Sequence, residues 1–140
     1  MHDAISRVQA LASTTEWFIA AGLEETPNQA DAWITARDQD GEERWTWRPA
    51  PVSPLGDEIE SVALDGSGNV IAVGFTGPQR WALSLDPGGA LRWSTTWAAP
   101  ALGRDILRDV GVLADGDLIV VGEIVGDDGS LDGWIARLAP

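Results

Sequence analysis

The feature that most constrains this chain is a series of short apolar segments separated by glycine-rich turns, clearest over residues 57–97 (DEIESVALDGSGNVIAVGFTGPQRWALSLDPGGALRWSTTW). The turns at residues 65–69 and 86–89 are rich in residues that tolerate positive φ. Alternating apolar residues predict half-buried strands, and the continuous run at residues 70–75 predicts a strand covered on both faces. We therefore expect this stretch to form one twisted sheet of four antiparallel strands.

The sequence on either side repeats this stretch through three anchors. The first is Asp-x-(Ile/Leu)-x-x-Val, the second is a glycine that closes the apolar strand, and the third is a tryptophan that opens the next strand. The anchors begin at Asp3, Asp57 and Asp105, the glycines are Gly22, Gly74 and Gly122, and the tryptophans are Trp33, Trp81 and Trp134. They divide the chain into repeats at residues 1–56, 57–104 and 105–140, with length differences confined to loops.

A period of about fifty residues with four strands per unit is typical of a β-propeller blade. A lone four-stranded sheet exposes two faces, so neighbouring blades must cover each other, and we expect Trp33, Trp81 and Trp134 to be equivalent and largely buried between them. A helical pattern at residues 4–11 is overruled by the repeat. The expected strands span residues 6–13, 16–23, 31–37, 44–48, 60–64, 70–75, 81–85, 91–97, 107–113, 118–124 and 133–138.

The predicted fold class is all-β, a single partial β-propeller domain over residues 1–140. Blade 1 would span residues 1–56 and blade 2 residues 57–104, each with four antiparallel strands. Blade 3, at residues 105–140, would be incomplete because its outer strand is missing from the pattern. Since propellers close with about four to eight blades, we expect the open ends to require further blades or copies of the chain.

Two segments of the middle repeat resemble known propeller repeats. Residues 62–77 (VALDGSGNVIAVGFTG) resemble the SBBP β-propeller repeat of bacterial surface and secreted proteins, and residues 82–93 (ALSLDPGGALRW) are similar to quinoprotein-like propeller repeats. Repeat 3 keeps the turn at residues 114–117, whereas repeat 1 is the most divergent and has residues 13–16 (STTE) at its turn. The resemblance implies a fold and an extracellular or cell-surface location, but no shared catalytic residues.

Charge and composition exclude several function classes. The formal net charge is −13, from 22 acidic and 9 basic residues, and there is no cysteine. An acidic surface repels nucleic acid and anionic membranes, and disulfides and thiolate metal sites are excluded. No run approaches the ~20 apolar residues of a spanning helix, and Met1 and the residues after it lack the character of a secretion signal. We therefore expect a segment or trimmed part of any exported protein.

Catalytic chemistry has no obvious carrier. The single histidine, His2, has no serine or cysteine partner motif, and Glu25, Asp38 and Asp40 have no spacing that suits a paired acid and base. We therefore predict no enzyme activity, no catalytic residue and no cofactor.

A metal site would need carboxylates alone, which favours Ca²⁺. The best cluster, residues 126–133 (GDDGSLDG), lacks the full calcium-loop pattern, so a solvated turn is expected there. Asp3, Asp57 and Asp105 are expected to make a turn or capping hydrogen bond before the innermost strand. The alternative is a ring of acids at a central channel, which would collect a cation or a basic ligand.

The function expected from these observations is a non-catalytic propeller scaffold or binding module of a bacterial surface or secreted protein, with a protein or glycan as a further partner. One alternative is a lectin-like carbohydrate binder that stacks sugars on Trp17 or Trp47. Another is part of a quinoprotein-like enzyme domain, which would require ring closure and basic or metal-binding side chains at the axis.

Overall fold

The computed structural model describes residues 5–25, 30–49, 56–77, 79–97, 105–125 and 128–139. Within these residues every regular element is a strand, so the all-β prediction is confirmed, and residues 5–11 lie in a strand despite their helical pattern. All eleven expected strands are found. They are β1 (Ile5–Ser13), β2 (Trp17–Glu25), β3 (Ala30–Asp38), β4 (Glu43–Trp47), β5 (Asp57–Leu64), β6 (Val70–Thr76), β7 (Gln79–Leu85), β8 (Leu91–Trp97), β9 (Asp105–Val112), β10 (Leu118–Val125) and β11 (Leu131–Leu138).

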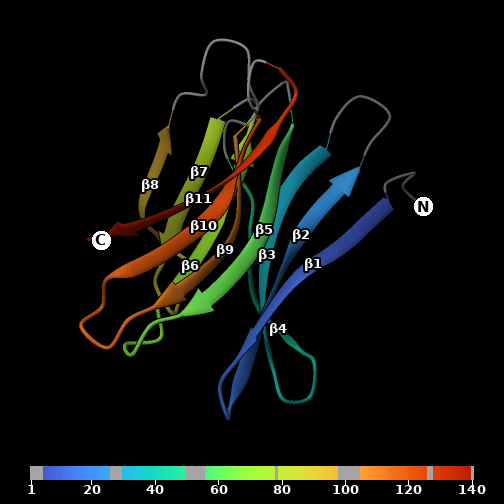
Figure 1. Ribbon diagram of the computed structural model, residues 1–140. Coiled ribbons are helices and arrows are strands. Elements are labelled where there is room, and N and C mark those ends of the chain that lie inside the picture. Colours follow the sequence, from blue (N-terminus) through green and yellow to red (C-terminus); the bar gives the residue numbers. More distant parts are fainter. Residues whose placement is uncertain are drawn as a thin grey trace.

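The strands form three antiparallel sheets, one for each repeat (Figure 1). Sheet A has the order β1-β2-β3-β4, sheet B the order β5-β6-β7-β8, and sheet C the order β9-β10-β11. Strand β5 contacts β1, β2 and β3, and β9 contacts β5, β6 and β7. Sheet B therefore lies between sheets A and C, and the first strand of each sheet packs on the face of the sheet before it.

Each first strand contains a β-bulge opposite the repeated glycine. The ladder skips Gln9 in β1, Glu60 in β5 and Arg108 in β9. At this point the backbone of the first strand presses against the second, because a Cβ built on Gly74 would lie 1.9 Å from the carbonyl oxygen of Glu58. The glycine anchor of the sequence is thus a requirement of the bulge, which leaves no room for a side chain.

The bulge also corrects one prediction about equivalent residues. Val8 pairs with Gly22 as Ile59 pairs with Gly74, and the position of Asp57 is taken in β1 by Ser6. The sequence-based equivalence of Asp3 with Asp57 and Asp105 is therefore wrong, and Asp3 itself lies outside the described residues. The error arises because β1 has an apolar residue at every third position, at Ile5, Val8 and Leu11. The repeat pattern can therefore be aligned with β1 in two ways that differ by three residues.

The core consists of two apolar layers, one between sheets A and B and one between sheets B and C. Trp33, Trp81 and Trp134 each pair with the repeated glycine, which confirms that they are equivalent. Only Trp81 is buried, because the ring of Trp47 from sheet A covers it at a centroid distance of 6.1 Å. Trp33 and Trp134 are only partly buried, so these two tryptophans are more exposed than Trp81.

Aspartates at the hairpins explain part of the acidic composition. The Oδ1 atom of Asp65 accepts hydrogen bonds from the backbone N–H groups of Ser67 (2.8 Å) and Asn69 (2.9 Å), and Asp38 and Asp86 make the same two contacts in their own turns. Burial acts to raise the pKa of Asp65, but hydrogen bonds from Asn69 and Ser67 and the charge of Arg92 outweigh it and hold that pKa below its ordinary value. These acids therefore stabilise turns.

Candidate functional site

The outer faces of sheets A and C, here called end face A and end face C, are covered by no other sheet of the described chain. The pairing registers allow each exposed position to be compared with its buried counterpart in sheet B. Ile59 and Val62 are 0% and 7% exposed, whereas their counterparts Val8 and Leu11 on end face A are each 66% exposed. These end faces thus carry apolar side chains in the positions that form the core elsewhere.

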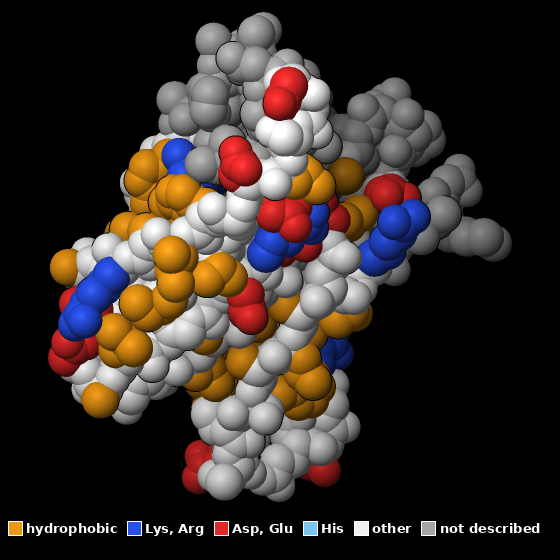
Figure 2. Space-filling model, viewed as in Figure 1, with side chains coloured by type: hydrophobic (Ala, Val, Ile, Leu, Met, Phe, Trp, Pro, Cys, Tyr) orange, Lys and Arg blue, Asp and Glu red, His pale blue; other side chains and the backbone are white. Residues whose placement is uncertain are grey.

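End face C shows the same relation. Ile135 is 70% exposed, whereas its counterpart in sheet B, Ala82, is fully buried under sheet C. A shallow hollow on this face is lined by Asp109, Val110, Gly111, Ile119 and Val121. Figure 2 shows hydrophobic side chains gathered over β10 and β11. Exposed apolar patches of this kind mark contact surfaces.

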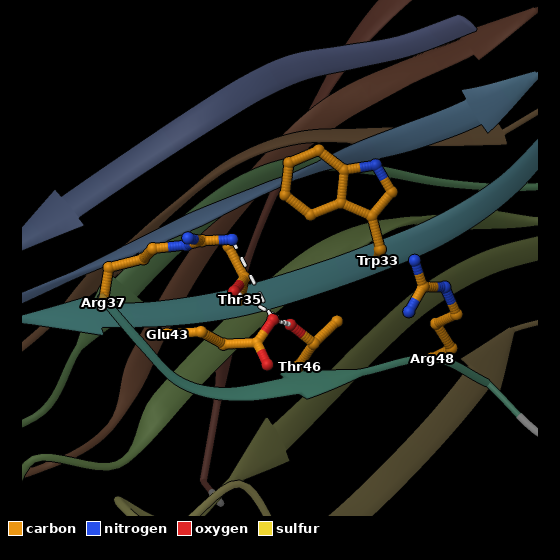
Figure 3. A pocket seen from close by; sticks show the side chains of 6 residues that line it. All are labelled: Trp33, Thr35, Arg37, Glu43, Thr46 and Arg48. Atoms are coloured by element: carbon orange, nitrogen blue, oxygen red, sulfur yellow. Dashed lines mark hydrogen bonds and ion pairs between the residues drawn. The ribbon is translucent and has the colours of Figure 1, made fainter. Parts of the chain in front are cut away.

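End face A also has a polar half, which contains a pocket of about 220 Å³ between β3 and β4 (Figure 3). Two of its residues, Thr35 and Arg37, stand where sheet B has the buried Leu83 and Leu85. This pocket was not predicted from the sequence. The anchors would have shown that Thr35 and Arg37 of repeat 1 align with leucines of repeat 2. The lining residues are Trp33, Thr35, Arg37, Glu43, Thr46 and Arg48.

The polar groups of this pocket bind mainly one another. Arg37 donates a hydrogen bond to the carbonyl of Gly41 (3.1 Å), and another of its nitrogens lies 3.9 Å from Glu43. Thr46 donates to Glu43 (2.6 Å), and the hydroxyls of Thr35 and Thr46 lie 3.0 Å apart. This arrangement offers a ligand hydrogen-bonding groups and an indole ring.

The first strands of the three sheets are joined by polar contacts along their length. Gln9 donates to Glu58, and Ser61 donates to Asp109 (2.7 Å). Arg108 bridges the carboxylates of Glu60 (3.4 Å) and Glu123 (3.2 Å). Burial acts to lower the pKa of Arg108, and the two carboxylates outweigh it and raise that pKa. The edge of the stack formed by β1, β5 and β9 therefore carries a line of polar side chains that contact one another.

Among the recurring aspartates, the structure describes the side chain of Asp57, which is the first residue of β5. Its side chain is buried, and it accepts a hydrogen bond from the hydroxyl of Thr76 (2.5 Å) on the neighbouring strand. The side chain of Asp105 and the whole of Asp3 lie outside the described residues. The alternative of a ring of acids at a central channel therefore falls on residues outside the described part of the chain.

The two tryptophans considered for sugar stacking are both half-buried and pack against the core between sheets A and B. The guanidinium of Arg44 lies 4.8 Å from the ring centre of Trp17, and Trp47 lies against Trp81. Neither indole is thus presented as an open platform.

The other residues considered for chemistry take part in local contacts where the structure describes them. In the calcium candidate, Asp128 accepts a hydrogen bond from the backbone of Ser130 (2.9 Å). Hydrogen bonds from the Ser130 side chain and backbone lower the pKa of Asp128. Gly126, Asp127 and the single histidine, His2, lie outside the described residues. Glu25 forms an ion pair with Arg7 at 3.3 Å. Across the described ranges, no three potential metal-ligating side chains come together.

The described residues include no helix that could cross a membrane. The chain matches no protein-family model and no curated protein.

Proposed function

We propose that this chain is a non-catalytic segment of a β-propeller-type scaffold, of the kind found in SBBP repeats of bacterial surface and secreted proteins, and that its end faces bind further sheets of the same kind. The observation that carries the proposal is the contrast between Ile59, fully buried in sheet B, and Val8, its counterpart on end face A, which is 66% exposed. A position that is core in one repeat and surface in the next indicates a missing neighbour.

The two end faces are of opposite kinds. End face C corresponds to the face of sheet B that sheet C covers, and end face A corresponds to the face of sheet B that rests on sheet A. Contact between them is therefore heterologous, joining the last sheet of one segment to the first sheet of the next. Such contacts close a ring when the rotation per sheet allows it, and either further blades or copies of this chain can supply the partner.

The energetic gain comes mainly from the apolar half of each end face. Fully burying a leucine, valine or isoleucine side chain stabilises a structure by about 1.5–3 kcal/mol. Val8 and Leu11 on one face and Ile135 on the other would each contribute toward that range, less the cost of ordering them. The polar pocket beside Trp33 would lie at the outer part of such a contact, where its arginines can meet the acidic surface of a neighbour.

Light scattering on the purified chain, with matched surface variants, tests the proposal. We expect assembly into a discrete oligomer, and we expect Val8→Glu, Leu11→Glu or Ile135→Glu to reduce it, since each places a charge on an apolar end face. Thr15→Glu adds the same charge on an exposed turn and should leave assembly unchanged. A well-folded monomer at micromolar concentration, or equal assembly of all four variants, would contradict the proposal.

A further inference from the structure

The junction between sheets A and B shows how the fourth strand of sheet B, β8, and the turn before it pack against sheet A. Trp45 of β4 donates a hydrogen bond from its Nε1 atom to the carbonyl of Pro87 (2.9 Å), in the turn that leads into β8. The same ring lies directly against Gly89, where a Cβ would be only 2.7 Å away. Within sheet B, Trp81 of β7 donates a hydrogen bond from its Nε1 atom to the hydroxyl of Ser94 (2.9 Å) on β8.

The junction between sheets B and C has an equivalent tryptophan on the side of sheet B, but a hollow lies next to it. Trp93 is the counterpart of Trp45, and its buried Nε1 atom meets no acceptor among the described residues. Strand β11 pairs with β10, and within the described chain no strand pairs with its other edge. The hollow measures about 320 Å³ and is lined by Trp93, Thr95, Trp97, Leu118, Leu138 and Ala139.

We propose that this hollow and the outer edge of β11 bind an extended peptide strand, which pairs antiparallel with β11 and completes sheet C. Strand addition of this kind draws its affinity from the backbone ladder and its specificity from alternate side chains. The groove is continuous with the apolar layer between sheets B and C, so the added strand would extend a core that already exists. The proposal concerns the edge of sheet C, so it is independent of binding at the end faces.

The pairing of β7 with β8 predicts the register of the added strand. Leu83 pairs with Ser94, and Ala136 is the counterpart of Leu83 in sheet C. A peptide residue opposite Ala136 would therefore lie where Ser94 lies, within reach of the indole N–H of Trp134. A short hydroxyl side chain at this position, followed by Thr-Thr-Trp or a similar β-forming run, is the chemistry that the groove fits best.

A peptide segment is a better occupant than a fourth strand taken from a second folded copy. In each copy β4 and β8 are already paired with β3 and β7, so donating either of them would open a sheet. An extended segment from outside a folded sheet incurs no such cost.

The probe is a fluorescein-labelled synthetic peptide with the sequence of residues 89–97 (GALRWSTTW), titrated with the 140-residue chain and followed by fluorescence anisotropy. We expect saturable binding that a scrambled peptide of the same composition does not show. A peptide with valine in place of its serine should bind about two- to tenfold more weakly, because it loses one hydrogen bond to Trp134.

A double-mutant cycle locates the peptide. Trp134→Phe removes the indole N–H and should lower the affinity for the serine peptide by the same factor, while leaving the affinity for the valine peptide unchanged. Trp33→Phe makes the same substitution at the equivalent position of sheet A and should change neither affinity. Equal binding of the scrambled peptide, no binding by a chain that is folded by circular dichroism, or fully additive effects in the cycle would overturn the proposal.

Discussion

The repeated glycine offers the sharpest test of how the sheets are built. In Gly74→Ala the new methyl carbon would lie 1.9 Å from the carbonyl oxygen of Glu58, whereas real Cβ atoms essentially never come closer than 3.0 Å. The two strands must therefore separate by about 1 Å at the bulge, which lengthens the nearby ladder hydrogen bonds beyond their useful range of ~3.2 Å. Losing two or three of these bonds, at about 1 kcal/mol each, gives a cost of about 2–3 kcal/mol.

Thermal denaturation followed by circular dichroism measures this cost. At about 4 °C per kcal/mol for a chain of this size, the midpoint should fall by about 8–12 °C. Gly66→Ala is the matched control, since nothing lies within 4 Å of the position that its methyl group would take and its φ is not positive. If the Gly74 and Gly66 variants melted within about 2 °C of each other, the steric account of the bulge would be refuted.

Two further substitutions probe the core and a turn. Trp81→Ala should cost about 3–5 kcal/mol of unfolding free energy in chemical denaturation, and the half-buried Trp33→Ala clearly less. The Asp65 pKa is lowered in the folded chain, so its carboxylate stabilises the fold above the unfolded value of 3.8, and this contribution is lost as pH falls through the folded pKa. The stability difference between the natural chain and Asp65→Asn should therefore be smaller at about pH 2 than at about pH 7; a difference independent of pH would contradict the assignment.

Most of the strand pattern could be predicted because local and repeated signals agree. The alternation in β5 and β8, the continuous apolar run in β6 and the glycine turns all favour the same hairpins, and each recurs in the other repeats. The bulge was not predictable, because its extra residues are long polar side chains of a kind common at any strand surface; they are Gln9, Glu60 and Arg108. That extra residue is why Ile59 and Val62, three positions apart, face the same layer.

Burial was harder to predict because it depends on what lies beside a residue and not on the residue itself. Trp33 and Trp81 occupy the same place in their sheets, yet only Trp81 has a sheet packed over it. The pocket beside Trp33 was missed for the same reason, since its polar residues are informative only when set against the leucines of sheet B. The lack of a described strand beside β11 follows from the strand count, whereas the Nε1 of Trp93, which has no acceptor among the described residues, could be found only from the three-dimensional arrangement.

The position of sheet B between two neighbours has a consequence for how the chain unfolds. Stability in a linear stack is approximately a sum of terms for each sheet and for each contact between neighbours. Sheet B takes part in both contacts and sheets A and C in one each, so fraying should start at the two ends and reach β6 and β7 last. Two separate chains hold four such contacts between them, whereas a ring made from both would hold six. Closing the ring would thus remove the ends from which fraying begins and convert a gradual loss of structure into a single cooperative transition.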